Sequence, residues 1–102
     1  MTAAQTVKAL GALAHETRLA VFKMLVQAGP EGLTPGAIAD TLGVGGPPLS
    51  FHLKELSHAG LIESRHAGRN IFYSADFSAI DALLHYLTEN CCGGTPCALG
   101  AP

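Results

Sequence analysis

The stretch LGVGGPPLSFHLKELSHAGLIESRHAGR, which runs over Leu42–Arg69, decides the fold of this chain. It combines the signals of a short helix, a glycine that ends this helix, and the first half of a hairpin. Pro47 and Pro48 fit the first turn of a helix, where a missing N–H costs little. Gly60 fits the left-handed residue that ends one. These signals predict a helix over Pro47–Ala59.

The predicted helix has two different faces. Leu49, Leu53 and Leu56 recur at helical spacing and form an apolar stripe for the core. The face turned away from that stripe carries Pro47, Ser50, Phe51, Lys54 and His58. Small polar, aromatic and basic side chains on one face suit a helix that enters the DNA major groove. Taken alone, the helix is equally consistent with an ordinary amphipathic surface helix.

Three helices are predicted before this stretch. The first covers about Thr2–Ala14 and consists mostly of small residues, and the second ends at Gly29-Pro30. The second is expected to supply the core with Leu19, Phe22, Met24, Leu25 and Val26. The third opens with Thr34 as N-cap and Pro35 at its first position. Together with the Pro47–Ala59 helix and the glycine-containing turn between them, it predicts a helix-turn-helix.

After the Pro47–Ala59 helix, the periodicity changes from helical to extended. The runs Leu61–His66 and Asn70–Ala75 predict two strands, with a turn at Ala67-Gly68 between them. Arg65 and Arg69 flank this turn. The sequence therefore predicts a hairpin whose tip is basic.

A terminal helix is predicted from Asp76 to near Asn90. Its apolar positions are Ile80, Leu83, Leu84 and Leu87. So apolar a helix, placed after the hairpin has closed the core, is expected to pair with the first helix and with a second copy of the chain. Residues 91–102 have no periodicity and are expected to be loose without a ligand. We therefore predict a DNA-binding and dimerisation domain over 1–90 and a cysteine-containing tail over 91–102.

Composition limits the function. A length of 102 residues predicts one domain, and 48% hydrophobic against 14% charged residues favours an oligomer. The net charge of −2 counts against strong non-specific binding of nucleic acid, although Lys54, Arg65 and Arg69 concentrate three of the six cations. No signal peptide or bilayer-length apolar run is found, so a soluble, cytoplasmic protein is expected. No catalytic set can be traced, and an enzyme is not expected.

Two motifs carry a family resemblance. LAHETRLAVFKML over Leu13–Leu25 and LSFHLKELSHAGLIESRHAGRNIFYS over Leu49–Ser74, together with the cysteine-rich tail, resemble the ArsR/SmtB family of winged-helix repressors. The resemblance covers about Val7–Cys97. It implies a winged helix-turn-helix with the order ααααββα and a homodimer formed through the first and last helices. It also implies binding to an inverted-repeat operator, and release when a metal or metalloid binds.

The resemblance also limits which metal or metalloid site this chain can form. One group of arsenic-responsive members has a Cys-Val-Cys sequence where this chain has Thr34, Pro35 and Gly36, so that site cannot exist here. Zinc-type members use carboxylates and histidines of the terminal helix. Asp76 and Glu89 match two such positions, but Ser78 stands where a histidine is wanted.

The three cysteines resemble the thiol site of a second arsenic-responsive group. These are Cys91, Cys92 and Cys97. Soft thiolates select soft ions, and three sulfurs satisfy As(III) or Sb(III), whereas structural zinc takes four ligands. The leading hypothesis is therefore a repressor released by As(III) or Sb(III). Its predicted DNA-binding residues are Pro47, Ser50, Phe51, His52, Lys54, Arg65 and Arg69.

Alternative functions remain open at this point. The same fold could sense zinc or cadmium through Asp76, His85 and Glu89 with the tail thiols, or it could sense thiol oxidation. A carrier of thiols or metals that binds no DNA is a third interpretation. His15 and His58 are interpreted as structural, capping or surface groups.

Overall fold

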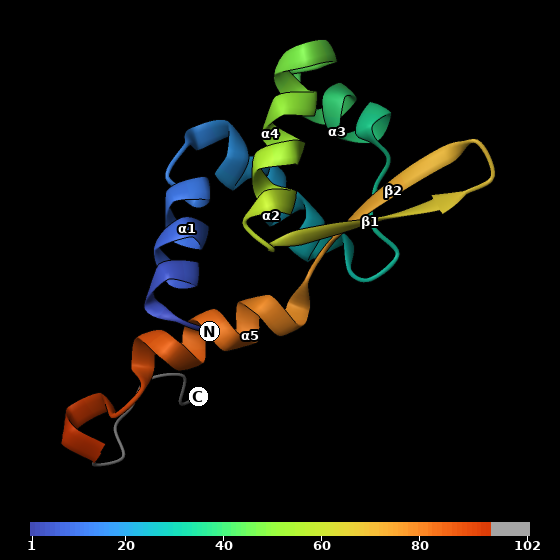
Figure 1. The fold of residues 1–102 in the computed structure, drawn as a ribbon. Coiled ribbons are helices and arrows are strands. Elements are labelled where there is room, and N and C mark those ends of the chain that lie inside the picture. The colour runs from blue at the N-terminus through green and yellow to red at the C-terminus, as the bar shows by residue number, and fades with distance from the viewer. Residues whose placement is uncertain (95–102) are drawn as a thin grey trace.

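The computed structural model describes residues 1–94, which form a winged helix-turn-helix (Figure 1). The elements in chain order are α1 (Ala3–Leu13), α2 (Glu16–Ala28), α3 (Pro35–Leu42), α4 (Gly46–His58), β1 (Ile62–Ala67), β2 (Asn70–Ala75), α5 (Phe77–Thr88) and a 3-10 turn (Cys91–Gly94). The strands pair antiparallel, from Ile62 opposite Ala75 to Ala67 opposite Asn70. The hairpin extends away from the helices as the wing, and the predicted order ααααββα is confirmed.

The helices of the helix-turn-helix begin and end close to the residues that the capping, proline and glycine signals predict. The Thr34 hydroxyl accepts the Ala37 N–H at 3.2 Å, with Pro35 at the start of α3. Gly43 ends α3 in the left-handed region with φ of 70°. The following helix, α4, starts one residue earlier than predicted, at Gly46, and Gly60 leaves it with φ of 78°.

The core lies where α2, α4 and the hairpin meet. Leu49, Leu53 and Leu56 are at most 3% exposed, so the predicted stripe of α4 is confirmed. The prediction for α2 is partly wrong. Leu19 and Val26 remain 45% and 37% exposed, because α2 packs on α4 and β2 with the neighbouring face that carries Val21, Phe22 and Leu25.

The hairpin is tied to the loop before α3. Leu33 and Tyr73 exchange two backbone hydrogen bonds, each 2.8 Å long, which add a one-residue bridge to the edge of β2. Gly32 precedes the bridge with φ of 76°, and a Cβ atom there would collide with the Tyr73 carbonyl. Only glycine allows this close approach of the two backbones.

Gly32→Ala is therefore expected to lower the free energy of unfolding by at least about 2 kcal/mol, because the left-handed backbone and the collision with β2 both oppose a side chain. Gly36→Ala is the control, since a Cβ atom there meets only the Thr34 hydroxyl at 3.9 Å. Urea unfolding followed by circular dichroism measures both variants. Equal stability of the two would contradict the role given to Gly32.

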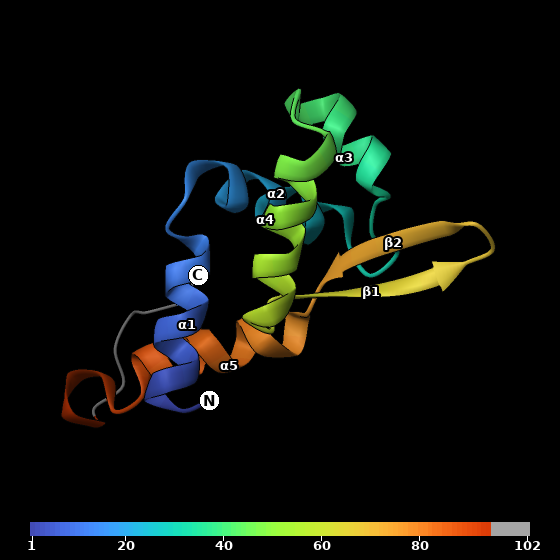
Figure 2. The same cartoon turned by 45° about the horizontal axis from the view of Figure 1, so that its top comes forward.

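Large apolar side chains remain exposed on α1 and α5. Val7 is 70%, Leu10 42%, Leu84 57% and Leu87 54% exposed. Figures 1 and 2 place both helices on the side of the molecule away from the wing. Within residues 1–94, no helix is long and apolar enough to cross a membrane.

Candidate nucleic-acid interface

The outward face of α4 is the centre of the candidate site. Its leucine stripe is buried against the core, and this fixes the opposite face toward solvent. Pro47 lies exposed in the first turn, followed along the helix by the exposed side chains of Ser50, Phe51 and Lys54. Phe51 is 53% exposed, although burying an aromatic ring is normally favourable. The face therefore offers hydrogen-bonding, apolar and cationic groups together.

The wing lies beside α4 and carries the two predicted arginines in different settings. Arg69 is exposed at the tip, between the strands. Arg65 donates from Nη2 to the Glu31 carbonyl oxygen at 2.8 Å, and its guanidinium carbon lies 4.7 Å from the centre of the Phe72 ring. Arg65 thus ties the wing to the loop before α3, while Arg69 extends the cationic surface outward.

The predicted residue His52 belongs to a group that crosses between two helices. Arg18 of α2 donates from Nε to His52 Nδ1 at 3.3 Å, and the His15 and His52 ring centres lie 4.7 Å apart. The Arg18 guanidinium also lies 5.7 Å from the centre of the exposed Phe51 ring. We call His15, Arg18 and His52 the basic cluster. Sequence reasoning missed Arg18, because 34 residues separate it from His52.

The surroundings of His52 favour its neutral form. Partial burial lowers the pKa of His52 most, and a positive charge on the nearby His15 or Arg18 lowers it further. His15 Nδ1 also accepts the Thr17 N–H at 3.2 Å, which confirms the predicted capping role of His15 at the start of α2.

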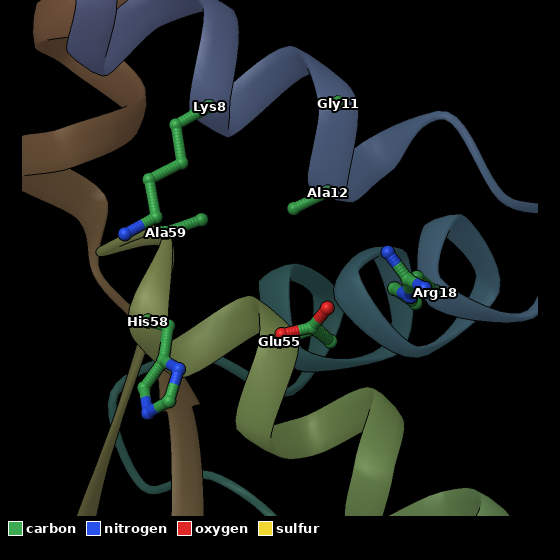
Figure 3. Close-up of a pocket in the computed structure, with 7 residues that line it drawn as sticks. All are labelled: Lys8, Gly11, Ala12, Arg18, Glu55, His58 and Ala59. Carbon is green, nitrogen blue, oxygen red and sulfur yellow. The ribbon is translucent and has the colours of Figure 1, made fainter.

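A hollow of about 260 Å³ separates α1 from α4 beside the basic cluster (Figure 3). Lys8, Arg18 and Glu55 line it from α1, α2 and α4. The Lys8 side chain reaches from α1 toward the end of α4, and the His58 ring points away from Arg18. The hollow between α1 and α4 is therefore lined by two basic side chains and one acidic side chain.

The predicted thiol site lies beyond α5. Cys91 and Cys92 follow the helix in the 3-10 turn, with their sulfur atoms 3.5 Å apart. Sulfurs that bind one ion at about 2.3 Å each can be at most about 4.6 Å apart, so this pair fits a shared ion. Cys97, the third predicted ligand, lies outside the described residues.

Asp76 has a local role in the structure. It caps α5, accepting the Ala79 N–H at 3.1 Å and a hydrogen bond from the Ser78 hydroxyl. The Ser78 hydroxyl is the main reason that the pKa of Asp76 is lowered. Within residues 1–94 of one subunit, no three His, Cys, Asp or Glu side chains are placed to hold a metal ion. The zinc or cadmium site at Asp76, His85 and Glu89 stays a prediction that would need tail thiols or a second subunit.

A helix-turn-helix with an exposed second helix and a hairpin wing defines a winged-helix protein. The family model described as a helix-turn-helix domain matches residues 13–65, more than half of the chain. The chain belongs to this family, and its relatives place it among the winged-helix regulators of ArsR type.

Named relatives support this assignment. The nodulation protein NolR of Rhizobium meliloti is 31% identical over 80 residues, which cover 78% of this chain and 63% of NolR. The chain thus spans less than two thirds of that curated relative. An ArsR-like transcriptional regulator from Rhodococcus sp. has a similar structure, with TM-score 0.73, 28% identity and coverage of 82% of this chain and 76% of that one. NolR from Sinorhizobium fredii gives TM-score 0.68, 29% identity and coverage of 87% and 86%.

A third solved relative is described as a homodimeric winged helix-turn-helix DNA-binding domain. It comes from a possible ArsR-family regulator of Mycobacterium bovis, with TM-score 0.65, 25% identity and coverage of 91% of this chain and 86% of that one. The Rhodococcus protein is described as an ArsR-like transcriptional regulator, and the Mycobacterium bovis protein as a possible one.

Proposed function

We propose that this protein is a homodimeric repressor that binds operator DNA and leaves it when As(III) or Sb(III) binds the tail cysteines. The observation that carries the DNA-binding part is the outward face of α4, where Ser50, Phe51 and Lys54 are exposed together beside the wing. Hydroxyl, aromatic and ammonium groups are the kinds of side chain that read base edges and phosphates.

For DNA binding, the positions of the basic side chains matter more than the net charge of the chain. The chain has a formal net charge of −2, so general attraction to DNA is weak. Lys54 and Arg69 nevertheless lie on the outward face and at the wing tip, and a symmetric dimer presents each of them twice. We expect each α4 to enter the major groove of one half of an inverted repeat, with half-sites about one helical turn or a multiple apart.

The apolar faces of α1 and α5 support the dimer. Val7 and Leu10 on α1, and Leu84 and Leu87 on α5, are each more than two fifths exposed in the single subunit. Contact between these faces in two copies would remove them from water. The homodimeric Mycobacterium bovis relative is consistent with this arrangement.

The sulfur pair supports the metalloid part of the proposal. Cys91 and Cys92 lie close enough to bind one ion, and Cys97 would supply a third sulfur. The pair follows directly after α5, whose exposed leucines are expected to form the dimer contact. Metalloid binding would therefore constrain the end of a dimer helix and change the relative setting of the two α4 helices. By linkage, operator DNA must weaken metalloid binding by the same factor.

The DNA-binding part is tested by selection from a random duplex library. We expect enrichment of an inverted repeat, and an affinity that falls as salt is raised because phosphate contacts release counterions. Absence of any enriched sequence would contradict the proposal that the protein is an operator-binding repressor.

The metalloid part is tested by titration with arsenite, followed through thiolate-to-arsenic absorption. We expect one arsenite per subunit in the native protein and none in the variant with Cys91, Cys92 and Cys97 replaced by serine. Stoichiometric binding by the serine variant would contradict the assignment of these ligands. Titration with zinc, cadmium or an oxidant tests the alternative signals, because a zinc or cadmium site at Asp76, His85 and Glu89 would retain part of its affinity without the thiols.

A further inference from the structure

We infer that His15, Arg18 and His52 form a binding site for a DNA backbone phosphate, on the flank of α4 opposite the wing. This inference rests on the proposed DNA binding and adds a contact to it. Figures 1 and 2 show the start of α2 on one side of α4 and the hairpin on the other. A recognition helix in the major groove has a phosphate strand along each rim. The wing would follow one rim, and the basic cluster would meet the other.

The contacts within the basic cluster place its donors beside the outward face. Arg18 is directed to that face by its hydrogen bond to His52 and by its position 5.7 Å from the Phe51 ring centre. Both imidazoles accept hydrogen bonds at Nδ1, His15 from the Thr17 N–H and His52 from Arg18. In the neutral rings the proton therefore lies on Nε2, which is a donor suited to a phosphate oxygen.

Phosphate binding at this site would be linked to protonation. Burial lowers the pKa of His52 most, and the charge of Arg18 and any charge on His15 lower it further; a phosphate beside these groups would compensate the charges. Protonation of His52 at Nδ1 would also break its hydrogen bond from Arg18 and release the guanidinium for two hydrogen bonds to the phosphate. The bound DNA thus raises the pKa of His52.

The other charged groups near His52 do not account for a rise in its pKa on DNA binding. Glu55 follows one turn later on α4, and Lys8 of α1 lines the hollow that Arg18 and Glu55 share. Glu16 adjoins His15 at the start of α2. Glu16 and Glu55 are the nearby acidic groups from these elements, and both are already present in the free protein, where the pKa of His52 is lowered. Only the added phosphate changes the charge balance on binding.

The sign of the pH dependence follows from this linkage. A higher pKa in the complex than in the free protein means that binding takes up protons and strengthens as pH falls between the two pKa values. Each unit by which the pKa rises strengthens binding about tenfold per subunit. Above the pKa of the complex, the contribution of this proton disappears.

The test measures affinity for the duplex selected from the random library, by fluorescence anisotropy at pH 6 and pH 8 and constant ionic strength. The native protein is expected to bind about tenfold or more tightly at pH 6. The variant His15→Gln with His52→Gln should lose most of this gain, because glutamine does not titrate. His58→Gln replaces a histidine of the same helix that lies outside the basic cluster, and this variant should keep the gain.

A second measurement needs no variant. The pKa of His52, followed by NMR of the native protein, should rise when the duplex is added. An unchanged or lower pKa would overturn the inference, as would equal pH dependence in the native protein and the double variant. Both of these results leave operator binding intact. Absence of sequence-specific binding at every pH would instead overturn the proposed function itself.

Discussion

Replacing Leu84 and Leu87 together with glutamate is expected to convert the protein into a monomer and to weaken operator binding at least about 100-fold. Both side chains are more than half exposed in the single subunit, so their replacement does not disturb its core. In the dimer they would become buried, and four unpaired carboxylates would oppose association. Loss of the second DNA-reading head removes the gain from two linked contacts, which reaches about 10²–10⁴. Analytical ultracentrifugation and fluorescence anisotropy measure the two effects.

Val26→Glu is the matched control for this prediction. Val26 is also a partly exposed apolar residue, but it lies on α2 and not on α1 or α5, which are expected to form the dimer surface. This variant should remain dimeric and bind the operator with nearly native affinity. A dimer that persists in the Leu84 and Leu87 variant would contradict the dimer surface proposed for α5.

The double substitution of Phe51 and Lys54 with alanine is expected to weaken operator binding by about 2–4 kcal/mol, or about 30- to 1,000-fold. Phe51 is 53% exposed and Lys54 is exposed on the same face of α4, so both are placed to touch DNA. Each occurs twice in the dimer. Loss of two lysine contacts should also lower the slope of log affinity against log salt by about 2. Anisotropy titrations at several salt concentrations measure both quantities.

Lys23→Ala is the control for the charge effect. Lys23 is an exposed cation of α2 outside the candidate interface, and its loss should leave the salt slope unchanged. Thermal unfolding should give similar midpoints for all these variants, because none of the replaced side chains is buried. Equal affinity of the Phe51 and Lys54 variant and the native protein would show that α4 does not read the operator.

Local signals were sufficient to predict the helices, the strands and the helix-turn-helix, and the family resemblance added the winged-helix fold. The leucine spacing of α4, the Thr34 cap and the left-handed exit at Gly60 act over one or two turns, and the structure has each of them. Helix ends differ from the prediction by one residue in places, as at Gly46, where α4 begins one residue before Pro47. Such short-range features depend on backbone sterics and periodicity, which can be read without knowing the partners in space.

Contacts between distant segments could not be predicted in this way. Arg18 and His52, and likewise Arg65 and Glu31, are each separated by 34 residues, and no local pattern pairs them. The error at Leu19 has a related cause. Its spacing is helical and apolar, but only the packing of α2 on α4 and β2 decides which face of the helix is buried. The sequence alone therefore identified the outward face of α4 but not the basic cluster beside it.

The thiol site could be predicted from the sequence only in part. The sequence showed three clustered cysteines, and the structure adds that two of their sulfurs lie 3.5 Å apart. The backbone of Asn90 and Cys92 is left-handed, with φ of 55° and 57°, so the chain turns directly after α5. The role of Cys97 stays a prediction, since it lies outside the described residues.

The most direct test of the switch is the anisotropy of a labelled operator duplex, saturated with protein and titrated with arsenite. The native protein is expected to release the duplex at about one arsenite per subunit. The protein in which serine replaces Cys91, Cys92 and Cys97 should bind the duplex equally well and keep it at every arsenite concentration. A native complex that persists in saturating arsenite, or equal release by the serine variant, would contradict the proposed metalloid switch.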